Sequence, residues 1–181
     1  MFKSSLIALA LTIGAGSALA SNPMVGGSEM FPVKNIIENA VNSKDHTTLV
    51  AAVKAAGLVE TLQGAGPFTV FAPTNDAFGA LPAGTVDGLL KPEAKATLTK
   101  ILTCHVIAAN AMSDAVMKMV DDDGGMHKVK TVGGCELTLK YKDGKVMVED
   151  ETGGIATVTI ADVAQSNGVI HVIDKVLLPK M

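Results

Sequence analysis

The ten residues 69–78, TVFAPTNDAF, constrain the fold more than any other segment of the chain. The first three, Thr-Val-Phe, predict a short buried strand because they are β-branched or aromatic. Pro73 lacks a backbone N–H and fixes its own φ angle, so the strand should end there. The next three side chains carry oxygens, at Thr74, Asn75 and Asp76. These oxygens can accept hydrogen bonds from the free N–H groups of a following helix, so the segment predicts a strand, a stop and a helix cap.

From residue 128 onward the apolar pattern changes to a period of two, which is typical of strands. Five strands are predicted there, at residues 129–132, 136–141, 145–149, 155–160 and 169–173. Glycine-containing dipeptides separate them, among them Asp143-Gly144 and Asn167-Gly168, and these suit tight turns. The last strand is apolar on both faces apart from His171, so it should lie at the centre of the sheet.

The preceding part of the chain carries apolar residues at helical spacing. We expect helices from residue 33 onward, with further helices around residues 92–102 and 113–120. Pro92 suits the first position of a helix, and Gly57 suits the end of one. The sequence contains no internal repeat. It therefore predicts a single α+β domain, with helices first and an antiparallel sheet last.

Residues 1–20 have the pattern of a signal peptide that is cleaved after Ala20. A positive charge, a short apolar stretch and an Ala-Leu-Ala cleavage site follow one another there. The apolar stretch is too short to span a bilayer. Residues 21–32 hold glycine, serine and proline with little periodicity and predict a flexible leader, so the domain would cover residues 33–179. The mature protein is therefore expected to be periplasmic or secreted, with no transmembrane segment.

Composition disfavours some classes of partner. The chain has a formal net charge of −3, and all 15 of its basic residues are lysines. Arginine, the residue that usually makes bidentate hydrogen bonds to phosphate and guanine, is absent, so a nucleic-acid partner is not expected. Tryptophan is absent and aromatic residues make up only 3% of the chain, which disfavours sugar-binding or base-stacking platforms built from aromatic rings.

The chain has two cysteines, Cys104 and Cys135. Two cysteines in one small domain of an oxidising compartment suggest a disulfide. Such a bridge would close a loop of about thirty residues and stabilise the fold by roughly 3–4 kcal/mol. The alternative is a pair of free thiols buried in the core.

Two long segments resemble the signatures of the fasciclin-like domain family. TVFAPTNDAF is similar to the first signature, and residues 167–179, NGVIHVIDKVLLP, are similar to the second. Between them the family usually carries Tyr-His at a helix-to-strand junction, where this chain has Cys104-His105. The resemblance covers about residues 33–179. It implies a wedge of N-terminal helices packed on an antiparallel β-sandwich, and a role in adhesion or extracellular interaction.

The resemblance also implies that eight residues of the family's motifs hold the scaffold. These residues are Thr74, Asn75, Asp76, His105, Asn167, Gly168, His171 and Asp174. In animal relatives, integrin recognition is tied to the Tyr-His pair and to the segment before the second signature. Cys104 replaces the tyrosine here, and residues 161–166, ADVAQS, lack the acidic and proline character of those motifs. Integrin binding is therefore not carried over to this chain.

The histidines and one acidic run give weak patterns for metal binding. His105 and His171 lie in apolar surroundings and are predicted to be neutral and hydrogen-bonded near the core. The spacing of His105, His127 and His171 from the cysteines fits no standard zinc pattern. The acidic run Asp121–Asp123 precedes Gly124, which could be the glycine at the sixth position of an EF-hand calcium loop. In that register the first position of the loop is a methionine and the twelfth is a lysine, and neither can bind calcium there.

The sequence contains no G-x-S-x-G elbow, H-E-x-x-H motif or P-loop. We predict no catalytic residue, no cofactor and no metal. With the family resemblance, these observations favour an exported, non-enzymatic interaction module that binds a protein or a component of the cell surface or matrix. The alternative is an exported carrier of a small ligand or a metal.

Overall fold

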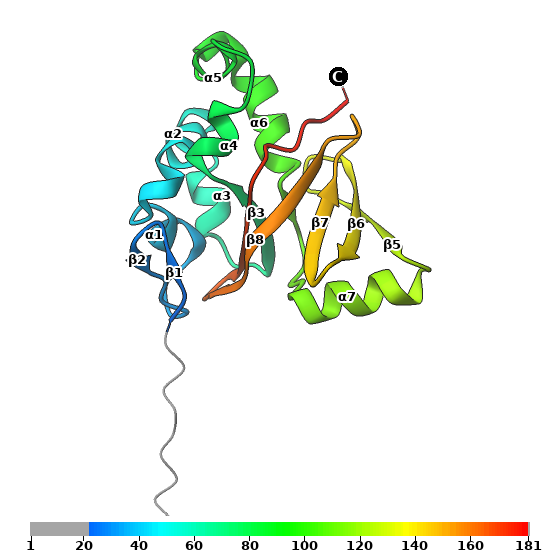
Figure 1. The fold of residues 1–181 in the computed structure, drawn as a ribbon. Helices are drawn as coiled ribbons and strands as arrows, with labels where there is room; N and C mark the ends of the chain where they lie inside the picture. Colours follow the sequence, from blue (N-terminus) through cyan, green and yellow to red (C-terminus); the bar gives the residue numbers. More distant parts are fainter. Residues whose placement is uncertain (1–21, 181) are drawn as a thin grey trace, which may run out of the picture.

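A seven-stranded sheet organises residues 22–180, the part of the chain that the computed structural model describes (Figure 1). Its strands lie in the order β4-β3-β9-β8-β7-β6-β5. Their bounds are Phe68–Pro73 for β3, Val106–Ile107 for β4, Met126–Lys130 for β5, Glu136–Lys142 for β6, Lys145–Glu149 for β7, Ile155–Gln165 for β8 and Gly168–Ile173 for β9. The signal peptide predicted at residues 1–20 lies outside the described residues.

Two interior strands of the sheet, β3 and β9, form a parallel pair, and they contain the strand parts of the two signature segments. Phe71 lies opposite His171 in this pair. Every other pairing in the sheet is antiparallel, so the α+β class is confirmed but the sheet is mixed rather than wholly antiparallel. Parallel pairing needs a long crossover, and the chain between β3 and β9 provides one of more than ninety residues.

Seven α-helices flank the sheet in the described residues. Their bounds are Ile36–Ala40 for α1, Thr47–Ala56 for α2, Val59–Gln63 for α3, Asn75–Gly79 for α4, Thr85–Leu89 for α5, Lys95–Thr103 for α6 and Ser113–Asp122 for α7, with 3-10 turns η1 at Lys44–His46 and η2 at Pro92–Ala94. Helices α1–α6 gather beside β3, whereas α7 lies along β5–β7 (Figure 1). Within residues 22–180, none of the helices has the length and apolar character that a bilayer crossing requires.

Alternating side chains of β3 and β9 build two separate cores. Val70 and Ala72 of β3 belong to the core beneath helices α1–α6, whereas Phe71 belongs to a second core. This second core lies between the strands and α7, whose Val116 and Val120 are each 1% exposed. Because successive residues of a strand point to opposite faces, the same two strands can seal both cores. The parallel pair β3–β9 therefore has no solvent-facing side.

Residues 22–32 differ from the flexible leader expected from composition. They form a small hairpin of β1, Met24–Val25, and β2, Ser28–Glu29. Val25 and Met30 are buried in the helical core, and the buried Asn39 side chain exchanges two hydrogen bonds with the backbone of Phe31. The two docked side chains, Val25 and Met30, lie among glycines, prolines and polar residues without a periodic pattern, so the sequence did not reveal this docking.

The structure joins Cys104 and Cys135 in a disulfide, with a Cα–Cα distance of 5.4 Å. Cys104 ends α6, and Cys135 lies in the turn between β5 and β6. Both residues are almost fully buried. The bridge therefore ties the last helix of the helical half to the edge of the sheet.

We expect replacement of both cysteines by alanine to lower the free energy of unfolding by roughly 3–4 kcal/mol, because the unfolded chain loses a cross-link over 31 residues. Urea unfolding of the oxidised protein and of the double variant measures this difference. The matched control is wild-type protein held under reducing conditions, which should unfold at the same urea concentration as the double variant. Two alkylatable thiols in the oxidised protein would contradict the bridge.

Candidate functional site

The first signature connects two helices and a 3-10 turn, α4, α2 and η1, through two polar side chains. The Thr74 hydroxyl accepts a hydrogen bond from the Ala77 N–H at 3.2 Å and so caps α4. The Asn75 side chain turns to another helix: its Oδ1 accepts from the Thr48 N–H at 3.0 Å, and its Nδ2 donates to the Lys44 carbonyl at 2.8 Å. Asn75 therefore holds the start of α2 rather than its own helix. Asp76 is exposed in the first turn of α4, where its charge favours the positive helix end.

The second signature begins with an asparagine that joins two more helices. Asn167 Oδ1 accepts from the Ile36 N–H at 3.1 Å, at the start of α1. Its Nδ2 donates to the carbonyls of Leu62 and Gly64 at 2.8 and 2.9 Å, at the end of α3. Glycine is required next in sequence, because a Cβ on Gly168 would lie 1.9 Å from the Phe68 carbonyl oxygen. The Asn-Gly turn thus locks the helical half onto β9.

His171 lies 2% exposed between the second core and the start of α7. Its Nε2 donates to the Ala111 carbonyl at 2.7 Å, and its Nδ1 accepts from the Asp162 N–H at 3.2 Å. Burial lowers the pKa of His171, so the ring is neutral at pH 7. The Asp162 carboxylate in turn accepts from the N–H of Ser113 at 2.7 Å and from its hydroxyl, at the first residue of α7.

His105 lies at the end of α6 and is also 2% exposed. Its Nδ1 donates to the Ile101 carbonyl at 2.8 Å, and its Nε2 accepts from the Leu177 N–H at 2.9 Å. The two histidines therefore hold opposite tautomers. Burial lowers the pKa of His105 to about 4, because the charged ring would lose its hydration. His105 fastens the C-terminal segment to the helical half, and Asp174, in the same segment, accepts from the Thr157 N–H at 2.7 Å.

Several buried polar residues in the structure were not predicted. Asp150 accepts from the N–H groups of Thr152, Gly154 and Leu178 at 2.8–2.9 Å, and it is 7% exposed. The D-x-T-x-G spacing of its turn is a local signal that could have identified it. His46, Asn39 and the half-buried Asp162 carry no such signal, because each side chain has a partner distant in sequence: Ala72 for His46, Gln165 for Asn39 and Ser113 for Asp162.

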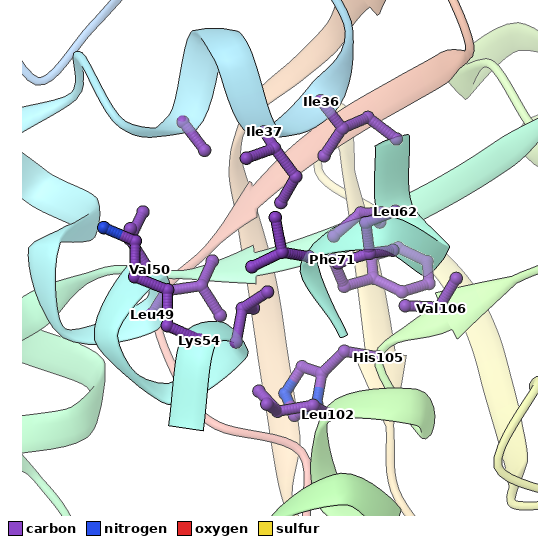
Figure 2. Close-up of a pocket in the computed structure, with 14 residues that line it drawn as sticks. Ile36, Ile37, Leu49, Val50, Lys54, Leu62, Phe71, Leu102, His105 and Val106 are labelled. Atoms are coloured by element: carbon purple, nitrogen blue, oxygen red, sulfur yellow. The ribbon is translucent and has the colours of Figure 1, made fainter. Parts of the chain in front are cut away.

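An apolar hollow of about 30 Å³ lies between α1, α2, α3, α6 and β3 (Figure 2). Aliphatic side chains and Phe71 line it, together with the neutral His105 ring and the exposed Lys54. Pockets that hold small ligands usually measure about 300–1,000 Å³. The hollow can take a methyl-sized group, but it is an order of magnitude too small for a cofactor.

The structure keeps the candidate metal ligands apart. His105 and His171 bind different backbone groups, and His127 pairs instead with Asp123, at 2.5 Å between Nδ1 and Oδ2. Across residues 22–180, no three side chains of the histidine, cysteine or carboxylate type gather in a way that could hold a metal ion. Within the acidic run, Asp122 pairs with Lys118 at 2.9 Å.

Acid is expected to destabilise the protein through its buried histidines. Between pH 6.5 and about 4 the unfolded chain protonates a histidine that stays neutral when folded, so the free energy of unfolding falls as the pH falls through this window. His105 alone accounts for about 3 kcal/mol of the loss. The lowered pKa values of His46 and His171 act in the same direction. Urea unfolding at several pH values measures the change.

Two variants isolate the histidine contribution from that of the carboxylates. His105→Gln should be less stable near neutral pH but should lose less stability on acidification than wild type. His127→Gln, at a more exposed site, is the matched control for the loss of one histidine. Equal acid sensitivity of His105→Gln and wild type would show that His105 titrates normally in the folded state.

We expect Asn167→Ala to lower the free energy of unfolding by about 2–4 kcal/mol, because three partly buried backbone groups lose their partner. Asp76→Asn, in the other signature, is the control and should change it by less than about 0.5 kcal/mol. Thermal and urea unfolding measure both variants. Similar costs for the two substitutions would contradict the difference in their contacts.

Comparisons with known proteins agree with the fold. The model of the fasciclin domain matches residues 44–179. Protein sll1483 of Synechocystis is 54% identical over 146 residues, which cover 81% of this chain and 74% of that protein. The cell surface glycolipoprotein MPB83 of Mycobacterium bovis is 33% identical over 166 residues, covering 92% of this chain and 64% of that protein.

Two animal proteins extend the comparison. The transforming growth factor-beta-induced protein ig-h3 of Sus scrofa is 36% identical over 148 residues, which are 82% of this chain but only 20% of that protein. The solved FAS1 domain pair of the insect cell adhesion molecule Fasciclin I matches with a TM-score of 0.57 and 25% identity, over 72% of this chain and 43% of that one. The signature segments, the fold and these relatives agree, and the chain belongs to the fasciclin domain family.

Proposed function

We propose that this protein is an exported, non-enzymatic interaction module that binds a protein or a component of the cell surface or matrix. Family membership supports a cell-surface or adhesion-type role in general, because relatives are a cell surface glycolipoprotein and a cell adhesion molecule. The finer statement, that this chain itself binds such a partner, is our proposal.

The observation that carries the proposal is the use of the signature side chains inside the fold. Asn75, Asn167, His105 and His171 each direct their polar atoms to backbone groups of other elements. A side chain whose donors and acceptors are occupied in this way positions elements and has little capacity left for a partner. We therefore assign these residues to the scaffold and recognition to the outer surface of the domain.

Export is part of the proposal. The pattern of residues 1–20 is that of a signal peptide, and the Cys104–Cys135 disulfide suits an oxidising compartment. Periplasm and extracellular space both meet that condition.

The second candidate function is a carrier of an apolar ligand, which the apolar hollow of Figure 2 favours. At about 30 Å³ the hollow would have to open for any ligand larger than a methyl group. Native mass spectrometry of freshly purified protein separates the candidates. A reproducible bound mass would favour the carrier, whereas protein of the mass of the polypeptide alone favours the interaction module.

The direct test is binding of the mature protein to the envelope of the cells that produce it. We expect saturable binding of fluorescently labelled protein to intact cells or isolated envelope, with competition by unlabelled protein. The control is the same protein after reduction and alkylation, which should unfold more readily and bind less. Binding that neither saturates nor is competed would count against an adhesion-type role.

A further inference from the structure

The outer face of strands β5–β7 carries a group of lysines that neither core uses. Cross-strand pairing sets Lys128 opposite Thr138, Lys140 opposite Met147, and Lys142 opposite Lys145. The alternate residues of the same strands point inward and are buried, among them Leu137 and Leu139 of β6. We call the lysine face the set Lys128, Lys130, Lys140, Lys142 and Lys145.

Charge is segregated across this part of the molecule. The lysine face has five lysines, and the only carboxylates that β5–β7 place on it are Glu136 and Glu149, although the chain as a whole has a net charge of −3. Helix α7 packs on the opposite, inward face of the same strands, and it carries the acidic residues Asp114, Asp121 and Asp122. The sheet thus separates a positive face from a negative helix.

Among the described residues, three of the five lysines form no ion pair with a carboxylate, although Lys130 lies opposite Glu136 in the β5–β6 register. Lys128 pairs with Glu136 at 2.7 Å and Lys140 pairs with Glu149, but among the described residues no carboxylate lies within 4.0 Å of the amino groups of Lys130, Lys142 or Lys145. Lys142 and Lys145 face each other directly beside the turn, with Asp143 between them in sequence. Like charges directly opposite on a sheet are destabilising. An anionic partner would relieve this repulsion.

We propose that the lysine face binds an anionic polysaccharide of the cell surface or matrix, through its carboxylate or sulfate groups. The inference rests on the proposed function and names its surface and its class of partner. Lysine ammonium groups are point charges on flexible side chains, and they bind carboxylate or sulfate without the planar fit that arginine imposes. Recognition here is by charge, so the scarcity of aromatic platforms does not oppose it. Charges spread over three adjacent strands match a linear polyanion better than one compact anion.

The dimensions and composition of the face disfavour other occupants. Three strands of about five residues cover on the order of 250 Å². A stable second copy would need about 800 Å² per partner. Insertion into a membrane interface relies on aromatic and large aliphatic side chains. Strands β5–β7 place two methionines on this face, Met126 and Met147, but no aromatic ring, because Tyr141 alternates to the other side of β6. An electrostatic contact with a soluble or matrix polymer needs neither a large area nor insertion.

The test measures binding of the mature protein to immobilised polygalacturonate and dextran sulfate, with unmodified dextran as the uncharged control. The variant Lys130→Gln/Lys142→Gln/Lys145→Gln removes the three lysines without carboxylate partners, so it leaves no glutamate unpaired. The matched variant Lys54→Gln/Lys91→Gln/Lys95→Gln removes the same charge from exposed lysines of the helical half. Equal melting temperatures of the three proteins establish that all are folded.

We expect wild type to bind the two polyanions at about 50 mM salt, to lose most of this binding at about 300 mM, and not to bind dextran. The sheet variant should bind at least roughly tenfold more weakly, whereas the matched variant should stay within about twofold of wild type. Equal losses in both variants, or equal binding to phosphatidylglycerol vesicles, would overturn the inference. Envelope binding that survives in the sheet variant would overturn it too, while leaving the proposed function intact.

Discussion

The parallel pairing of β3 with β9 is the constraint on which the rest of the structure depends. It brings two segments about 100 residues apart into one pair, with Phe68 opposite Gly168. Because each strand turns alternate side chains to opposite faces, the pair closes the helical core on one side and the sheet core on the other. Loss of this pairing would open both cores together. The two signatures are thus halves of a single structural element.

Side-chain-to-backbone hydrogen bonds extend this pair to the helices. Asn75 follows β3 and holds α2, Asn167 precedes β9 and holds α1 and α3, and His171 within β9 holds the start of the α7 region. Each of these hydrogen bonds joins elements that are distant in sequence. Removal of the side chain would leave a backbone N–H or carbonyl group without a partner and poorly solvated. Burial also keeps His105 and His171 neutral, because a charged ring would lose its hydration, and this lowers their pKa although the Asp150 and Asp162 carboxylates favour the charged form.

The sequence was sufficient for elements that have a local signal. The period-two pattern located β5, β6, β7 and β9 to within three residues and the start of β8, although β8 runs on to Gln165, past its predicted end at residue 160. The Pro73 stop and the Thr74 cap stand where the sequence placed them. The sequence was insufficient where a residue contacts a partner that is distant along the chain. The parallel register of β3, the reach of Asn75 to α2 and the docking of Val25 and Met30 depend on the assembled core, which no local spacing encodes.

The central claim is that the signature residues hold the scaffold and that recognition lies on the outer face of β5–β7. Acetylation footprinting of lysines by mass spectrometry, with and without isolated envelope, tests both halves of this claim in one experiment. The account predicts that envelope lowers the modification of Lys130, Lys142 and Lys145 and leaves that of Lys44 and Lys54, beside the first signature and the apolar hollow, unchanged. Protection of Lys44 and Lys54 with the sheet lysines still fully reactive would contradict it.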